Sequence, residues 1–260
     1  MKRLARILSV VILILAALGA ASWPLYSRLT THVISEGKAI YNANIFPLWD
    51  SWYVSSRWLQ IAEHPSQISR TPMWFYPFGV NLSVTNPCHY IQLVAAAARP
   101  LVGFPADVNI EGLFILLLNG LGFFIACRKL GIGYDVAAVS AVLYSLNPYA
   151  FRHAFEGGTD QAITWFFVIY LVFFLEACMR GGRKTIVLAT LFLGLTGFFY
   201  WFTAAFAVVL GFLALPLFML LQPRGRRLAP AVRLFVIYIL FLSISLPLLY
   251  PLLSQGLQEG

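Results

Sequence analysis

Charged residues are scarce in this sequence. Asp, Glu, Lys and Arg make up 11% of the 260 residues, against about a quarter in a typical globular protein, while 60% of the residues are hydrophobic. A soluble domain of this length cannot bury so much apolar surface, and the same composition excludes intrinsic disorder. The apolar residues form long runs and not the alternating segments of about ten residues that build membrane barrels. The composition therefore predicts an all-α, polytopic membrane protein.

Cysteine and the short motifs of common enzymes are equally scarce. The three cysteines, Cys88, Cys127 and Cys178, have no metal-binding spacing, and an odd count argues against a disulfide framework. The sequence has no phosphate-binding loop, no serine-hydrolase elbow and no zinc-protease motif. We therefore predict no metal site and no cofactor.

Seven apolar segments are candidates for membrane-spanning helices. The first, 7–26, could be a signal peptide, but its length of about 20 residues favours an uncleaved helix. The segment 185–221 could cross once, but the basic clusters at both of its ends favour a hairpin that turns near Gly197–Trp201. The full set is 7–26, 108–126, 136–146, 161–177, two helices within 185–221, and 229–250.

The distribution of Lys and Arg predicts the orientation of these spans. The seven-span topology places 12 of the 18 basic residues and 2 of the 10 acidic residues inside, which leaves +10 inside and −2 outside. The N-terminus is then cytoplasmic, and the net charge of +8 reflects topology and gives no indication of nucleic-acid binding. We expect a single transmembrane domain over 1–260, with an external loop containing interfacial helices over 28–107 and a helical bundle over 108–250.

The predicted spans carry few polar side chains, which argues against a transporter. Asn119 is the clearest polar residue at depth, and it predicts a hydrogen bond to a neighbouring helix. In the external loop, the short apolar run 91–101 predicts a shallow helix that breaks at Arg99-Pro100.

The run 45–60 of the external loop combines aromatic residues with one early carboxylate. At helical spacing Trp49 and Trp52 fall on one side, while Asp50 and Arg57 share another. Asp50 would lie in the first helical turn, where the helix dipole favours the ionised carboxylate. Aromatic rings beside an ionised carboxylate suit a sugar site. The alternative is an interfacial helix in which the Trp residues are membrane anchors.

A second polar segment joins two spans at the outer surface. Arg152, His153, Glu156 and Asp160 fall within nine residues of one another. The guanidinium and the imidazole could hold a phosphate. The alternative is a solvated loop in which Thr159 or Asp160 caps the next helix.

The order of several short motifs resembles the GT-C superfamily of integral-membrane glycosyltransferases, in particular the bacterial branch related to protein mannosyltransferases. The resemblance covers roughly residues 1–221, and since the chain ends soon after the seventh span, it implies an N-terminal portion. The motifs are Leu48–Trp52 with Trp58, Phe75–Leu82, Ala126–Gly131, Ser145–Tyr149 followed by His153, and Gly194–Tyr200.

The resemblance implies a transferase at the outer face of the bacterial cytoplasmic membrane. Its donor would be a sugar on a polyprenyl phosphate, and its acceptor a hydroxyl of a glycan, lipid or protein. Asp50 would be the catalytic base or polarising group, Arg152 and His153 would hold the lipid phosphate, and Glu156 or Asp160 would be a second acid. The alternative is a non-catalytic protein of the same fold that binds the lipid carrier or assists assembly. The predicted substrate-binding residues are Trp49, Trp52, Arg57, Arg152, His153, Glu156 and Asp160.

Overall fold

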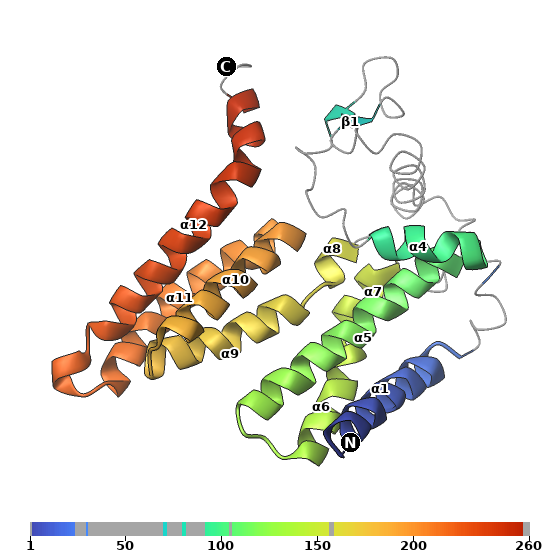
Figure 1. The fold of residues 1–260 in the computed structure, drawn as a ribbon, viewed down its shortest axis with the longest axis horizontal. Coiled ribbons are helices and arrows are strands. Elements are labelled where there is room, and N and C mark those ends of the chain that lie inside the picture. The colour runs from blue at the N-terminus through green and yellow to red at the C-terminus, as the bar shows by residue number, and fades with distance from the viewer. Residues whose placement is uncertain are drawn as a thin grey trace. The chain divides into compact units, whose positions relative to one another are not determined.

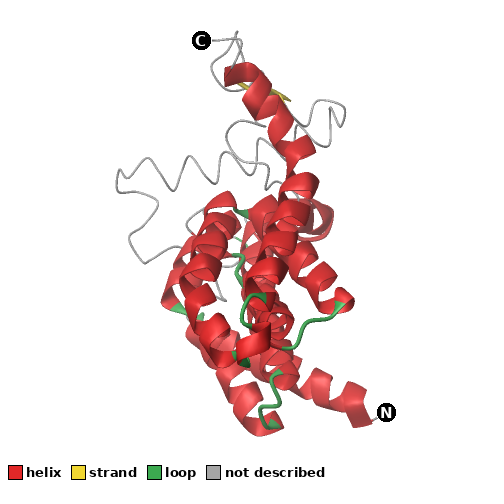
Figure 2. Ribbon diagram, turned by 90° about the vertical axis from the view of Figure 1, so that its left-hand side faces the viewer, coloured by secondary structure: helices red, strands yellow, loops and turns green. Residues whose placement is uncertain are grey.

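The computed structural model of the chain is built almost entirely of helices (Figure 1). It describes residues 2–23, 30, 70–71, 80–81, 92–103, 106–155 and 159–256. Within these ranges the strands are one short antiparallel pair, β1 (Arg70–Thr71) and β2 (Val80–Asn81). Figure 2 shows how far helix dominates over strand and loop. The all-α class predicted from the composition is confirmed.

Helices lie within each of the seven segments that the sequence predicts as spans, but residues 163–164 interrupt the helix over 161–177. Four of them contain stretches long and apolar enough to cross a membrane, namely 4–21, 109–129, 201–221 and 224–246. The helices are α1 (Lys2–Ala21), α4 (Gln92–Val102), α5 (Ala106–Lys129), α6 (Tyr134–Ser145), α7 (Pro148–Phe155), α8 (Thr159–Ala162), α9 (Trp165–Met179), α10 (Arg183–Phe199), α11 (Trp201–Leu221) and α12 (Ala229–Gly256), with a 3-10 turn, η3 (Arg224–Arg226), before α12.

The four candidate spans carry large apolar side chains on their outer surfaces. On α11, Phe206 is 71% and Leu213 is 74% exposed, and on α12 Phe235 is 65% exposed. Contiguous apolar surface of this kind is rare on soluble monomers, whereas lipid tails cover it without cost. The fold is therefore that of an integral membrane protein.

The helix α4 differs slightly from its prediction. It runs from Gln92 to Val102 and continues through Pro100, so the break expected at Arg99-Pro100 is wrong. Proline removes one backbone hydrogen bond to the preceding turn. Because Pro100 lies only two residues before the end of α4, the helix ends soon after it in any case.

The chain divides into two compact units, and unit 1 comprises residues 1–124 and 133–163. Its helices α1, α5 and α6 meet at Gly120 of α5, which is buried. A Cβ atom at this position would lie 2.9 Å from Ile14 of α1 and 3.0 Å from the carbonyl oxygen of Ala141 of α6. Small residues allow membrane helices to approach closely, so Gly120 sets the spacing of these three helices.

Unit 2 comprises residues 125–132 and 164–260. Its core is formed by α9, α10, α11 and α12 around the fully buried Tyr170 and Leu193. The hydroxyl of Tyr238, on α12, donates a hydrogen bond to the carbonyl oxygen of Val208, on α11, at 2.9 Å. A Cβ atom at Gly211 would overlap this hydroxyl, so the glycine makes room for the contact between the two helices.

The segment 185–221 forms two antiparallel helices. The helix α10 ends at Phe199, Tyr200 has extended backbone, and α11 begins at Trp201. Gln222, which follows α11, donates from Nε2 to the carbonyl oxygen of Met179 at the end of α9, at 3.0 Å. Because α10 begins only four residues after Met179, the start of α10 and the end of α11 lie at the same end of unit 2. This is the arrangement that the predicted hairpin requires.

The same end of unit 2 gathers its positive charge. Arg233 of α12 donates to the carbonyl oxygens of Ala177 and Cys178 in the last turn of α9, at 3.3 and 3.0 Å. Lys129 of α5 forms an ion pair with Glu176 at 3.0 Å. We call this region the basic end of unit 2. It contains Arg128, Lys129, Arg180, Arg183, Lys184, Arg224, Arg226, Arg227 and Arg233.

Candidate functional site

The helix α7 carries Arg152 and His153 of the predicted phosphate site. The helix begins at Pro148. Proline suits the first helical position, because the backbone N–H that it lacks would have no partner within the helix there. The side-chain oxygen of Asn147 accepts a hydrogen bond from the backbone N–H of Tyr149 at 2.9 Å, which caps the helix. The segment expected as an open loop between two spans is therefore largely helical, with α7 followed by the short α8. The alternative of a solvated loop is wrong for 148–155.

Arg152 and His153 lie in the last turn of α7. Arg152 is exposed, whereas His153 is half-buried and its ring lies 4.4 Å from the ring of Tyr149. Positive side chains near the C-terminus of a helix interact favourably with the helix dipole. The position is thus suited to holding cations at the surface of unit 1, where an anionic group can reach Arg152.

A glycine in α5 places α7 directly against that helix. A Cβ atom at Gly112 would lie 2.7 Å from the ring of Phe155 and 2.8 Å from the carbonyl oxygen of Ala154. Both Ala154 and Phe155 are buried, so they form the packed face of α7. The contact fixes the C-terminal turn of α7, which carries Arg152 and His153, beside the first turns of α5.

Those first turns of α5 carry two buried carboxylates. Asp107 is 1% exposed, and Glu111 is 0% exposed. Their spacing of four residues places them on one side of the helix, and Asn109 between them is also buried. Burying a carboxylate costs several kcal/mol unless other groups compensate it. Ionisable residues inside a membrane protein are accordingly reserved for function in most cases, so we count Asp107 and Glu111 as site candidates.

The sequence prediction missed both of these residues. Both lie at the start of a predicted span, where a carboxylate is expected to be an ordinary surface charge. The signal was present in the spacing: Asp107 and Glu111 repeat at one helical turn, and Gly112 follows, which allows another helix to approach closely.

Asn119 anchors the segment that follows α7. Its side-chain amide donates to the carbonyl oxygen of Ala162, the last residue of α8, at 2.7 Å, and both residues are buried. The prediction that Asn119 bonds a neighbouring segment is confirmed. The bond satisfies a carbonyl at the end of a helix and holds α8 against α5 within unit 1.

The structure brings only part of the predicted site together. Arg152 and His153 share one end of unit 1 with Asp107 and Glu111. Asp160 lies in α8, although its side chain is outside the described part. The remaining predicted site residues lie outside the described residues; they are Trp49, Asp50, Trp52, Arg57 and Glu156.

Metal ligands do not cluster in the described ranges. Within them, no three His, Cys, Asp or Glu side chains gather closely enough to hold a metal ion. The site consists there of Arg152 and His153 on α7 and Asp107 and Glu111 on α5. Comparisons of the chain with protein-family models, with curated proteins and with solved structures find no match.

Proposed function

We propose that this membrane protein is a glycosyltransferase that moves a sugar from a polyprenyl phosphate to an acceptor hydroxyl at the outer face. The observation that carries the proposal is the meeting of α7 and α5 in unit 1. There the exposed Arg152 and the half-buried His153 lie beside a helix end with the buried carboxylates Asp107 and Glu111. A cation for a phosphate and acids for hydroxyl groups are the side chains that such a transfer requires.

The proposed reaction assigns the proton to Asp50 and the donor phosphate to Arg152 and His153. The acceptor oxygen forms a bond to the anomeric carbon, and its proton passes to Asp50. The bond between that carbon and the donor phosphate oxygen breaks, and polyprenyl phosphate leaves with the bonding electrons. Arg152 and His153 stabilise the negative charge on the departing phosphate. The order of the GT-C-like motifs supports these roles, and a lipid-linked donor explains why the sequence needs no nucleotide-binding motif.

An assay of donor turnover tests the proposal. The full chain, reconstituted in bilayers with a membrane extract as the source of acceptors, should convert polyprenyl-phosphate hexoses to free polyprenyl phosphate. The matched control is the corresponding nucleotide-linked hexoses, which should not be consumed. Binding of the polyprenyl sugars without turnover would favour the alternative of a non-catalytic carrier-binding protein. Consumption of the nucleotide sugars alone would exclude the proposed donor class.

The proposed topology has seven spans in the bacterial cytoplasmic membrane, with a cytoplasmic N-terminus. Its support comes from unit 2, in which all the described Lys and Arg residues lie at the basic end. At the opposite end, the rings of Phe166 and Phe199 stack at 5.0 Å, next to Trp165, Tyr200 and Trp201. Positive charge inside and aromatic residues at the outer interface are the usual distribution in membrane proteins.

Thiol labelling of intact cells can test this orientation. Cys88, in the predicted external loop, should react with a membrane-impermeant reagent, whereas Cys127 and Cys178 should not, because they are 5% and 0% exposed. Gly225→Cys adds a reporter at the basic end, where a Cβ atom meets nothing within 4 Å. The new thiol should react only after the cells are permeabilised. Labelling at position 225 in intact cells would reverse the topology.

A further inference from the structure

The basic end of unit 2 carries a set of exposed cations on two neighbouring connections. The turn between α9 and α10 and the connection from α11 to α12 are held together by Gln222, which bonds the carbonyl of Met179. Arg233 reaches from α12 to the same end of α9. The exposed cations on these connections are Arg180, Arg183, Lys184, Arg224, Arg226 and Arg227.

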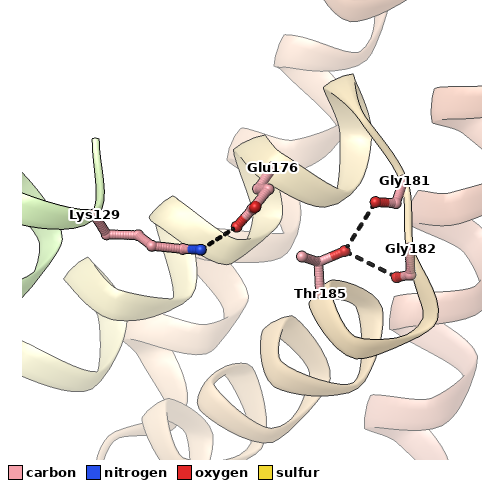
Figure 3. A network of polar contacts seen from close by, with 5 residues as sticks. All are labelled: Lys129, Glu176, Gly181, Gly182 and Thr185. Carbon is pink, nitrogen blue, oxygen red and sulfur yellow. Dashed lines mark hydrogen bonds and ion pairs between the residues drawn. The ribbon is translucent and has the colours of Figure 1, made fainter. Parts of the chain in front are cut away.

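The backbone of the α9–α10 turn fits closely around Arg233. Gly181 has φ +77°, a conformation that favours glycine, and a Cβ atom there would lie 2.7 Å from Cζ of Arg233. Thr185 of α10 turns back, and its hydroxyl donates to the carbonyl of Gly182 at 2.8 Å (Figure 3). The turn is therefore held in place by its own contacts and does not need the six exposed cations for its shape.

Negative charge to balance these cations is missing from the described part of unit 2. Glu176 is the only carboxylate in that part, and Lys129 already pairs with it at 3.0 Å (Figure 3). None of the six exposed cations forms an ion pair with a described residue. With no described carboxylate left to balance them, these six cations form a positive patch that attracts an external anion.

The surroundings of the cations identify the chemistry of that anion. The group lies where α11 and α12, two of the candidate spans, reach the end of their apolar stretches. Three large apolar side chains flank it: Leu220 is 68%, Leu221 is 57% and Leu228 is 69% exposed. Cations at the ends of apolar helices, next to exposed leucines, match a molecule that is anionic at one end and a hydrocarbon at the other.

We propose that the basic end of unit 2 binds the headgroups of anionic phospholipids. The phosphates lie between the α9–α10 turn and the α11–α12 connection, and the acyl chains run along the leucines. Clusters of Lys and Arg next to a membrane helix attract anionic lipids in this way. This inference requires only that α11 and α12 cross the membrane, and it is independent of the proposed transferase activity.

Competition between two lipids tests the proposal. The purified full chain is placed in mixed micelles with phosphatidylglycerol and phosphatidylcholine in equal amounts, and the lipids retained are counted by native mass spectrometry. The wild-type protein should retain phosphatidylglycerol preferentially. The triple variant Arg224→Gln, Arg226→Gln, Arg227→Gln should lose at least about tenfold in apparent affinity for phosphatidylglycerol and keep its affinity for phosphatidylcholine.

A matched variant removes the same charge elsewhere. Lys2→Gln, Arg3→Gln, Arg6→Gln neutralises three cations at the end of another candidate span, α1. It should change the preference clearly less than the first triple variant does, because these cations lie on a single helix end and not on two connections that hold a headgroup between them. If both triple variants lost the same affinity for phosphatidylglycerol, the effect would be a general attraction between any cations and anionic lipid, and the proposal would be overturned. A wild-type protein that showed no preference between the two lipids would also overturn it. If the variant at positions 224, 226 and 227 does not fold, the double variant Arg183→Gln, Lys184→Gln tests the α9–α10 turn instead. Retention of phosphatidylglycerol at the wild-type level in this double variant would overturn the proposal.

Discussion

Replacing Asp50 with asparagine is expected to lower the turnover of polyprenyl-linked sugar by roughly 10²-fold or more. Asparagine keeps the shape of the side chain but can neither accept the proton of an acceptor hydroxyl nor polarise it by charge. If Asp50 is the base, the loss falls on the rate of transfer, while the apparent affinity for the donor changes little. Donor-release kinetics on the reconstituted full chain measure both quantities.

Asp135→Asn is the matched control for this experiment. Asp135 is an exposed carboxylate in the first turn of α6, on the face that the proposed topology places in the cytoplasm. Its removal should leave turnover within about twofold and cost no more than a surface substitution does. Near-normal turnover in Asp50→Asn, with a thermal unfolding midpoint like that of the wild type, would remove Asp50 from the catalytic role.

The helices of this protein were predictable because membrane helices obey simple length rules. A run of apolar residues with a basic residue at its end is sufficient to place a helix, as α5 with Arg128 and Lys129 illustrates. The break at Tyr200 was also predictable, although no proline marks it. Basic clusters at both ends of one long apolar segment can share a side of the membrane only if the segment turns back.

Short helices were harder to predict from composition. The segment 148–155 follows Asn147-Pro148 and carries Arg152 and His153, which suggested a loop, but its buried face consists of Ala150, Ala154 and Phe155. These residues form a helix because α5 offers a glycine-lined surface at Gly112 for them to pack against. Tertiary contacts of this kind override local composition, and a single sequence does not reveal them.

The candidate site was predicted in part for a related reason. Arg152 and His153 were recognisable because a guanidinium beside an imidazole between two spans is conspicuous in a sequence with few charges. Asp107 and Glu111 were not, since a carboxylate at the start of a span looks like an ordinary surface charge. Their burial follows from the packing of unit 1, and only the helical spacing of the two acids hinted at it.

Replacing Arg152 with glutamine should weaken donor binding more than acceptor binding. A charge-assisted hydrogen bond that becomes buried in a complex is worth roughly 1.5–3 kcal/mol, or roughly 10- to 150-fold in affinity. Because Arg152 is exposed in the free protein, solvent screens part of this energy, and we expect an effect near the lower end, about tenfold.

The variant Arg152→Lys separates charge from simple loss of a side chain. It keeps the cation, so its donor affinity should lie between those of the wild type and Arg152→Gln, with the difference from wild type reflecting the lost bidentate contact. Donor titrations at fixed acceptor, and acceptor titrations at fixed donor, measure the two affinities separately. Donor curves that coincide for the wild type and Arg152→Gln would mean that Arg152 only flanks α7 at the surface. Equal weakening for donor and acceptor would instead indicate a general disturbance of unit 1, because a phosphate clamp acts only on the substrate that carries the phosphate.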